Sequence, residues 1–200
     1  MSDSSRETRL WIAATAVVVF TYSTLYVARF ATEWLRERNL LRLALALVFA
    51  LVLGWVARFL VRARPGRREL ALLAVVALIY ASLFLLLKRA EEAMHFVQYG
   101  LLGGLFYAAL DERRRRLGPG GWLRRVPTVS AVVLTLALGW GDEGIQHLLP
   151  NRYYDLRDVA FNAVAGGLAV LAMAGRRWAR EQDRQARETG AAAASPDPGL

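Results

Sequence analysis

Imidazole, amide and phenol groups share one helix face in the segment KRAEEAMHFVQYGLLGG. His95, Gln98 and Tyr99 occupy positions i, i+3 and i+4, a spacing that places them side by side on a helix. An imidazole beside a carboxylate can act as a general acid or base, and amide and hydroxyl groups can orient a bound molecule. This face is therefore a candidate for catalysis or ligand binding.

Carboxylates and further polar groups recur at the same helical spacing in two later segments. The pairs four residues apart are Asp142 with Gln146, Glu143 with His147, and Asp158 with Asn162. Ionisable groups inside apolar segments are costly unless they meet partners or water, so by default they indicate a functional site.

Arg152 follows Pro150 closely and adds a cation to these segments. Its planar guanidinium can bind a carboxylate or phosphate through two N–H groups at once. The chemistry of each side chain then suggests its role. The catalytic candidates are His95, Asp142, Glu143 and Asp158, and the ligand-binding candidates are His95, Gln98, Tyr99, Gln146, Arg152 and Asn162.

Metal binding and covalent catalysis are less favoured by the same residues. Imidazole and carboxylate suit several divalent ions, but the sequence has no HExxH or comparable pair, so we predict no bound metal and no cofactor. No Ser, Cys or Thr is placed by its spacing as a nucleophile. Whether the chain is an enzyme stays open, and the alternative role for the polar residues is an interhelical clamp that only fixes packing.

Six apolar runs carry these polar residues, and each is about long enough to cross a hydrocarbon core of roughly 30 Å. They are Leu10–Ala28, Leu40–Leu60, Leu70–Leu87, Ala93–Leu110, Pro127–Leu149 and Val159–Ala174. A hydrophobic content of 56% indicates an integral membrane protein. Because the runs show no period-2 alternation, we predict an all-α, polytopic membrane bundle of six transmembrane helices.

Lysine and arginine are unevenly distributed between the predicted connections. With six membrane spans, 18 of the 26 Lys and Arg residues lie on the side of both termini. Cytoplasmic connections carry the excess of positive charge, so both termini are predicted to be cytoplasmic and the polar segments to face outward. Topology explains the net charge of +9, and no nucleic-acid partner is expected.

The chain divides into a single transmembrane domain, residues 1–176, and a charged cytoplasmic helix extension with a disordered tail, residues 177–200. Between the first two runs, the segment RFATEWLRERNLLR predicts a short interfacial helix, because Phe30 and Trp34 stand among charges. The four arginines that begin at Arg113 are interpreted as a topology determinant. The chain has no cysteine, which excludes disulfides and thiolate metal sites.

Small residues predict which helices meet. Two small-xxx-small pairs, Gly100 with Gly104 and Ala163 with Gly167, lie on the fourth and sixth runs. Close approach of these helices is expected to bring His95 near Asp158 and Asn162. The predicted result is an outward-facing cleft lined by acid, amide and imidazole, with Arg152 at its rim.

The order and spacing of these motifs resemble the VanZ-like family of polytopic membrane proteins. The resemblance covers about residues 68–174 and is carried by His95-Phe96, Tyr99, Leu102-Gly103, Asp142-Glu143-x-x-Gln146, Pro150-x-Arg152, Asp158-x-x-x-Asn162 and Ala165-Gly166-Gly167. The chain departs from the family pattern at Glu91-Glu92, where Asp-Lys is common, and at Ala165, where Gly is common. The family is named for a protein associated with teicoplanin resistance. The resemblance thus implies a cell-envelope protein and a site, but no reaction.

Two functions of different classes follow from the sequence. In the first, a bacterial inner-membrane protein binds an anionic envelope lipid or glycan precursor in its outward cleft. In the second, the chain is a structural or accessory subunit whose partners are other membrane protein subunits. A small transporter is less favoured, because no inverted repeat and no charge pathway through the cytoplasmic halves of the later runs is visible.

Overall fold

The computed structural model describes residues 3–84, 90–148 and 155–194. The helices are α1 (Asp3–Glu37), α2 (Leu41–Ala63), α3 (Arg67–Phe84), α4 (Ala90–Leu117), α5 (Gly121–Arg125), α6 (Pro127–His147) and α7 (Leu156–Ala194). No strand occurs among the described residues, so the predicted all-α class is confirmed there.

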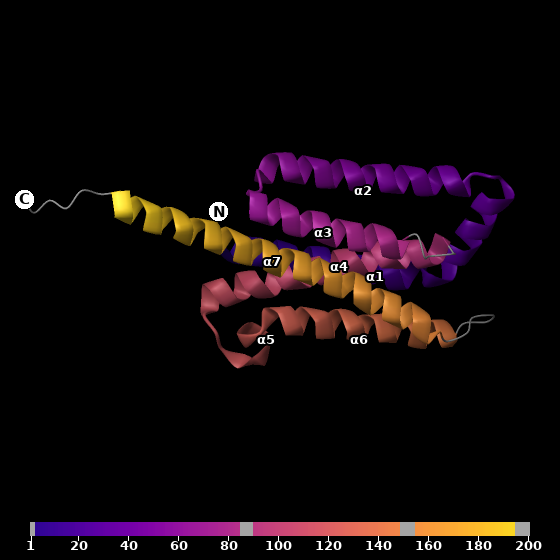
Figure 1. Cartoon of the computed structure of the whole chain (residues 1–200). Coiled ribbons are helices and arrows are strands. Elements are labelled where there is room, and N and C mark those ends of the chain that lie inside the picture. Colours follow the sequence, from indigo (N-terminus) through magenta and orange to yellow (C-terminus); the bar gives the residue numbers. More distant parts are fainter. Residues whose placement is uncertain (1–2, 85–89, 149–154, 195–200) are drawn as a thin grey trace, which may run out of the picture.

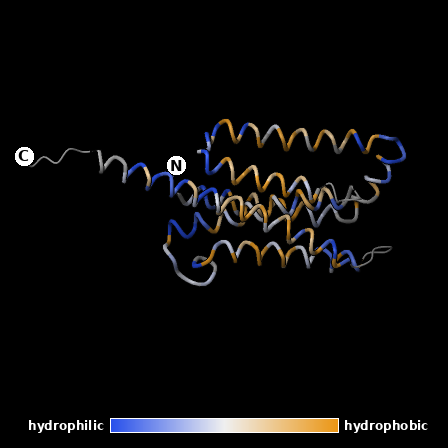
Figure 2. Tube along the Cα trace, viewed as in Figure 1, coloured by the Kyte–Doolittle hydropathy of each residue, from blue (hydrophilic) through white to orange (hydrophobic). Residues whose placement is uncertain are grey.

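Three helices in the described part of the chain are long and apolar enough to cross a membrane. They are Leu41–Ala63, Glu92–Leu117 and Leu156–Thr189. Figure 2 shows apolar residues along the middle of the long helices and hydrophilic residues towards their ends. The other three predicted spans coincide with α1, α3 and α6 and stay predictions as membrane spans.

The turn between α1 and α2 differs from the prediction. α1 continues without a break to Glu37, so most of the segment expected to form a separate interfacial helix belongs to α1. The chain then reverses at Asn39, whose φ of 57° lies in the left-handed region that Asn tolerates better than most residues. Backbone continuity of the helix therefore overrides the change from apolar to charged composition near Arg29.

The connection after α4 contains a short helix, α5, that the sequence analysis did not predict. Glycines with positive φ precede it at Gly118 and begin it at Gly121. Pro127 then starts α6 at a position where its missing N–H costs no helical hydrogen bond. At the other end of the chain, α7 runs on through the charged extension to Ala194.

α4 lies at the centre of the bundle (Figure 1). It packs against α7, α1 and α6, while α6 and α3 also pack against α7. α2 lies on the outside and contacts the other helices little. The core is accordingly built around large side chains of α4, among them Phe96, Tyr99, Leu102, Phe106 and Leu110.

The two ends of the bundle differ in chemistry. The N-terminus, the α2–α3 connection, the end of α4 and the second half of α7 share one end (Figure 1). We call this the arginine-rich end, since it carries Arg58, Arg62, Arg64, Arg67, Arg68, Arg113 to Arg116, Arg176, Arg177 and Arg180. The beginning of α4, the end of α6 and the beginning of α7 form the opposite end, called here the polar end.

α4 and α7 approach each other most closely at two glycines. A Cβ atom on Gly103 would stand 2.5 Å from the carbonyl oxygen of Gly166 and 2.8 Å from its Cα, so only glycine fits there. The predicted helix pair is correct, but the closest approach lies one position before the predicted Gly104 and Gly167. Gly104 faces Met173 at an ordinary distance, and a Cβ on Gly167 would meet nothing within 4 Å. Small-residue spacing indicates that two helices meet, but it does not fix their rotation.

Four buried acids tie the helices together at the arginine-rich end. The interhelical pairs are Glu7 with Arg116, Glu112 with Arg6, Asp111 with Arg177, and Glu69 with Arg176 and Arg180. The distance is 2.7 Å for Glu7 with Arg116 and 3.5 Å for Glu112 with Arg6. Part of the arginine run at Arg113 thus binds acids of the bundle, a role that the sequence analysis did not predict.

Glu69, at the start of α3, receives two arginines of α7. Arg180 Nε donates to Glu69 Oε2 at 2.9 Å, and Arg176 Nε donates to Oε1. Burial alone would raise the pKa of the Glu69 carboxyl, but the hydrogen bonds and charges of Arg180 and Arg176 outweigh it and hold the pKa below its usual value of 4.5. The contacts of Glu69 with Arg176 and Arg180 join α3 to α7.

Replacing Gly103 by Ala should destabilise the α4–α7 contact by about 1–3 kcal/mol, because the new methyl group meets the backbone of Gly166. Gly167→Ala is the matched control: its methyl group meets open space, and alanine favours a helix, so stability should hold or rise. Thermal unfolding in detergent compares the two variants. Equal stability of both would contradict the assigned contact.

Replacing Glu69 by Gln should destabilise the protein by about 3–5 kcal/mol, because it leaves two arginines beside an uncharged group. A depressed folded-state pKa gives stability that is present above the unfolded pKa and lost as pH falls through the folded pKa. Wild type should therefore lose more stability than Glu69→Gln as pH drops below 4.5.

The control for Glu69 is Glu188→Gln, which removes an exposed partner of Arg184 within α7 and should cost at most about 0.5 kcal/mol. Unfolding scans of all three proteins from neutral to acid pH give the comparison. If Glu69→Gln had the same acid sensitivity as wild type, the contact between α3 and α7 would not have the assigned role.

Candidate functional site

The polar residues singled out in the sequence come together at the polar end, where α4, α6 and α7 meet. We define the polar cluster as His95, Tyr99, Asp142, Glu143, Gln146 and Asn162. Asp142 is 0% exposed, while Glu143 and Asn162 are each 1% exposed. Asp142 and Glu143 are therefore enclosed by the bundle, although they stand near the end of α6. Their neighbours in the fold are protein groups.

Asp142 is the centre of the cluster and meets two residues of α4. Tyr99 donates its hydroxyl to Asp142 Oδ2 at 3.1 Å. His95 Nδ1 lies 3.0 Å from the same oxygen, but the ring N–H is not aligned with it as a hydrogen bond requires. The distance nevertheless calls for a proton on Nδ1, because a bare nitrogen lone pair would repel the carboxylate.

A backbone carbonyl of α6 extends this network to α1. Tyr22 of α1 donates to the Leu138 carbonyl at 2.8 Å, and the Tyr99 hydroxyl also reaches that oxygen, at 3.2 Å. Since Tyr99 has a single hydroxyl proton, it serves either Leu138 or Asp142 at one time. Tyr22 was not among the site residues predicted from the sequence. The one signal for it was the row of hydroxyl side chains in the α1 segment TYSTLY.

Two glycines on α6 make room for these contacts. A Cβ on Gly139 would lie 3.2 Å from Asn162 Cβ and 3.5 Å from a ring carbon of Tyr99. A Cβ on Gly141 would lie 3.1 Å from the Tyr22 hydroxyl. The sequence GWG in the last part of α6 therefore lets the neighbouring helices bring their polar groups up to its backbone.

Glu143 joins the end of α6 to the start of α7. Its Oε1 accepts a hydrogen bond from Gln146 Nε2 at 3.3 Å, and its Oε2 accepts one from the Asp155 backbone N–H, also at 3.3 Å. Asp155 in turn caps α7, since its Oδ1 accepts the Arg157 N–H at 2.9 Å. In this arrangement Glu143 fixes the geometry of the helix ends, although the sequence made it a catalytic candidate.

Besides His95 Nδ1, two buried atoms of the cluster lack a hydrogen-bond partner within the described part of the chain. They are Asp142 Oδ1 on α6 and Asn162 Nδ2 on α7. One is an acceptor and the other a donor. Buried polar atoms without partners are costly, so these two groups have hydrogen-bonding capacity that water or a ligand can fill.

The remaining predicted site residues lie less centrally. Gln98 and Asp158 are half-buried, and His147 is exposed at the end of α6. His95 was expected near Asp158 and Asn162, but the contact that the structure gives it is with Asp142 on α6. The predicted role of Arg152 stays a prediction, because Arg152 and Pro150 lie outside the described residues.

Among the residues that the structure describes, no group of three His, Asp or Glu side chains is arranged to hold a metal ion. The cluster therefore offers hydrogen bonds and charge. Its chemistry is that of an imidazole paired with a carboxylate, a buried amide and a phenol.

Comparison of the chain with protein-family models, curated proteins and solved structures finds no match. The VanZ-like resemblance accordingly stays a prediction from the sequence motifs.

Tyr99→Phe should destabilise the protein by about 1.5–3 kcal/mol, because it removes a hydrogen bond to the buried Asp142 carboxylate. Tyr22→Phe is the matched control: it removes the same hydroxyl from a neutral carbonyl and should cost only about 0.5–1.5 kcal/mol.

Reversible unfolding in detergent measures both losses, and Asp142→Asn completes a double-mutant cycle with Tyr99→Phe. The cycle should show stronger coupling between Tyr99 and Asp142 than between Tyr22 and Asp142, because Tyr22 connects to Asp142 only through the shared Leu138 carbonyl and Tyr99. Additive losses for Tyr99 and Asp142 would refute the proposed centre of the cluster.

Proposed function

We propose that this chain is a six-span bacterial inner-membrane protein of the VanZ-like type, with both termini in the cytoplasm. Its polar end faces outward and binds an anionic envelope lipid or glycan precursor. The separation of the two ends supports this topology, because the arginines gather at the end that holds both termini.

One observation carries the binding proposal: Asp142 Oδ1 and Asn162 Nδ2 are buried, come from different helices and lack partners in the described part of the chain. A hydroxyl group can donate to a carboxylate and can accept from an amide. Sugars and glycerol carry such hydroxyls. The cluster thus suits the uncharged, hydroxyl-bearing part of an envelope lipid or glycan.

The charge of the ligand requires a different contact. Asp142 and Glu143 are both acids, so a phosphate beside them would be repelled. In the proposal Arg152 holds the anionic group at the rim, while the hydroxyl-bearing part reaches inward to Asp142 and Asn162. His95 and Asp142 position the ligand or move a proton, and we assign no reaction to them.

The alternative function is an accessory subunit of a larger membrane complex, in which the cluster only locks α4, α6 and α7 together. The outer position of α2 favours it. None of the apolar part of α2 is buried within the bundle, and the exposed Leu51 and Val61 leave a face available to another membrane protein.

Native mass spectrometry of the protein released gently from native membranes tests the binding proposal. Wild type should retain an envelope lipid or precursor, and Asn162→Leu and Arg152→Ala should each retain at least about tenfold less, the effect of one lost buried hydrogen bond or charge contact. Leu156→Ala is the control, because Leu156 is 69% exposed at the same end.

Loss of the bound molecule in the two site variants, but not in the control, would support an outward binding site. Retention of a protein partner by all four proteins, without any bound lipid or glycan, would instead support the accessory subunit.

A further inference from the structure

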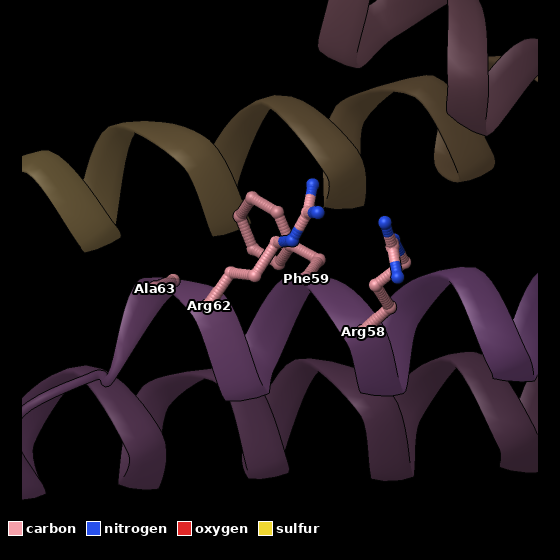
Figure 3. A pocket seen from close by; sticks show the side chains of 4 residues that line it. All are labelled: Arg58, Phe59, Arg62 and Ala63. Atoms are coloured by element: carbon pink, nitrogen blue, oxygen red, sulfur yellow. The ribbon is translucent and has the colours of Figure 1, made fainter.

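A cavity lies at the arginine-rich end, far from the polar cluster along the bundle. It has a volume of about 290 Å³ and is lined by Arg58, Phe59, Arg62 and Ala63 of α2. In Figure 3 the side chains of Arg58, Phe59 and Arg62 extend from α2 towards α7. Arg176 of α7 stacks over the Phe59 ring, with its guanidinium carbon 4.3 Å from the ring centroid. The cavity is thus an apolar hollow bordered by guanidinium groups.

The arginines around this cavity fall into two kinds. Arg176 already faces the carboxylate of Glu69. Arg58 and Arg62 are exposed and have no carboxylate within ion-pair distance in the described part of the chain. Because they stand four residues apart, they project from one helix face and can converge on the same anion. The two guanidinium groups are therefore available to bind an anion that is not part of the described chain.

The apolar surface beside these arginines has the length of one membrane leaflet. Leu43, Leu47 and Leu51 follow each other on the face of α2 that carries Arg58, and all three are exposed. Leu47 and Arg58 are separated by about 16 Å along the helix axis. Half of a hydrocarbon core is about 15 Å thick. A phospholipid can therefore lie along the leucines with its phosphate level with the arginine pair.

We propose that Arg58 and Arg62 bind the phosphate of an anionic phospholipid from the leaflet at the arginine-rich end, with its acyl chain along Leu47 and Leu51. Guanidinium groups bind phosphate through paired N–H donors, and clusters of arginine next to a membrane helix select anionic headgroups. α2 then docks to the bundle partly through the lipid, which fits its few direct contacts with the other helices.

Lipid titration in a neutral detergent, followed by native mass spectrometry, tests this site. The probes are phosphatidylglycerol, phosphatidylcholine and the soluble headgroup glycerol 3-phosphate. The Arg58→Gln/Arg62→Gln double variant should bind phosphatidylglycerol about 30-fold more weakly than wild type, the effect expected for two arginines at an anionic surface. Arg58→Gln alone should lower the affinity for phosphatidylglycerol about fivefold, and it replaces the double variant in the test if the double variant folds poorly.

The matched control is Arg184→Gln/Arg187→Gln, which removes the same charge from the exposed second half of α7 and should change the affinity less than about twofold. Equal binding of phosphatidylcholine to wild type would overturn the proposal. So would equal losses in the control variant, or glycerol 3-phosphate binding as tightly as the lipid, since the apolar row would then contribute nothing. None of these three results depends on the polar cluster or its ligand.

Discussion

The close contact of α4 with α7 at Gly103 and Gly166 sets the geometry of the whole bundle. Because the two backbones touch there, α4 and α7 cross at a fixed rotation, and the side chains before and after the contact are aligned. Towards one end this alignment brings Tyr99 beside Gly139 and Asn162. Towards the other it brings Asp111 to Arg177. The backbone contact between Gly103 and Gly166 thus positions two separate polar regions.

The two polar regions differ in how well their charges are satisfied. At the arginine-rich end each buried acid, such as Glu7 or Glu69, faces at least one arginine of another helix. Such pairing fixes the arrangement of the helices and leaves these buried acids little capacity for a ligand. At the polar end Asp142 contacts the Tyr99 hydroxyl and the His95 imidazole but no arginine of the described residues, and one of its oxygens lacks a hydrogen-bond partner there. This contrast makes the polar end the better candidate for function.

The sequence predicts the helices well, because each apolar run is long and uninterrupted. It predicts their ends poorly. The charged residues after Arg29 still continue α1, since hydrogen bonding within a helix does not depend on hydropathy. The sequence also indicates that Asp142 and Asn162 belong to one site, because both stand at helical spacing beside other polar groups.

Contacts between distant segments could not be read from spacing. Glu7 and Arg116 are 109 positions apart, and neither segment contains a pattern that predicts their contact. Likewise, Tyr22 reaches the site only because Gly141 leaves room for its hydroxyl. The position of the glycine contact was missed by one residue for a related reason: helix rotation depends on all neighbouring side chains, and not on the small-residue pattern alone.

The central proposal is that the polar end of the α4–α7 pair lies outside the cell and the arginine-rich end inside. The chain has no cysteine, so single cysteines report the side of the membrane without background. The most direct measurement is labelling of Leu148→Cys and Arg187→Cys in intact bacterial cells with a membrane-impermeant maleimide. The account predicts that Leu148→Cys reacts in intact cells and that Arg187→Cys reacts only after the membrane is opened. Labelling of both from the same side would contradict it.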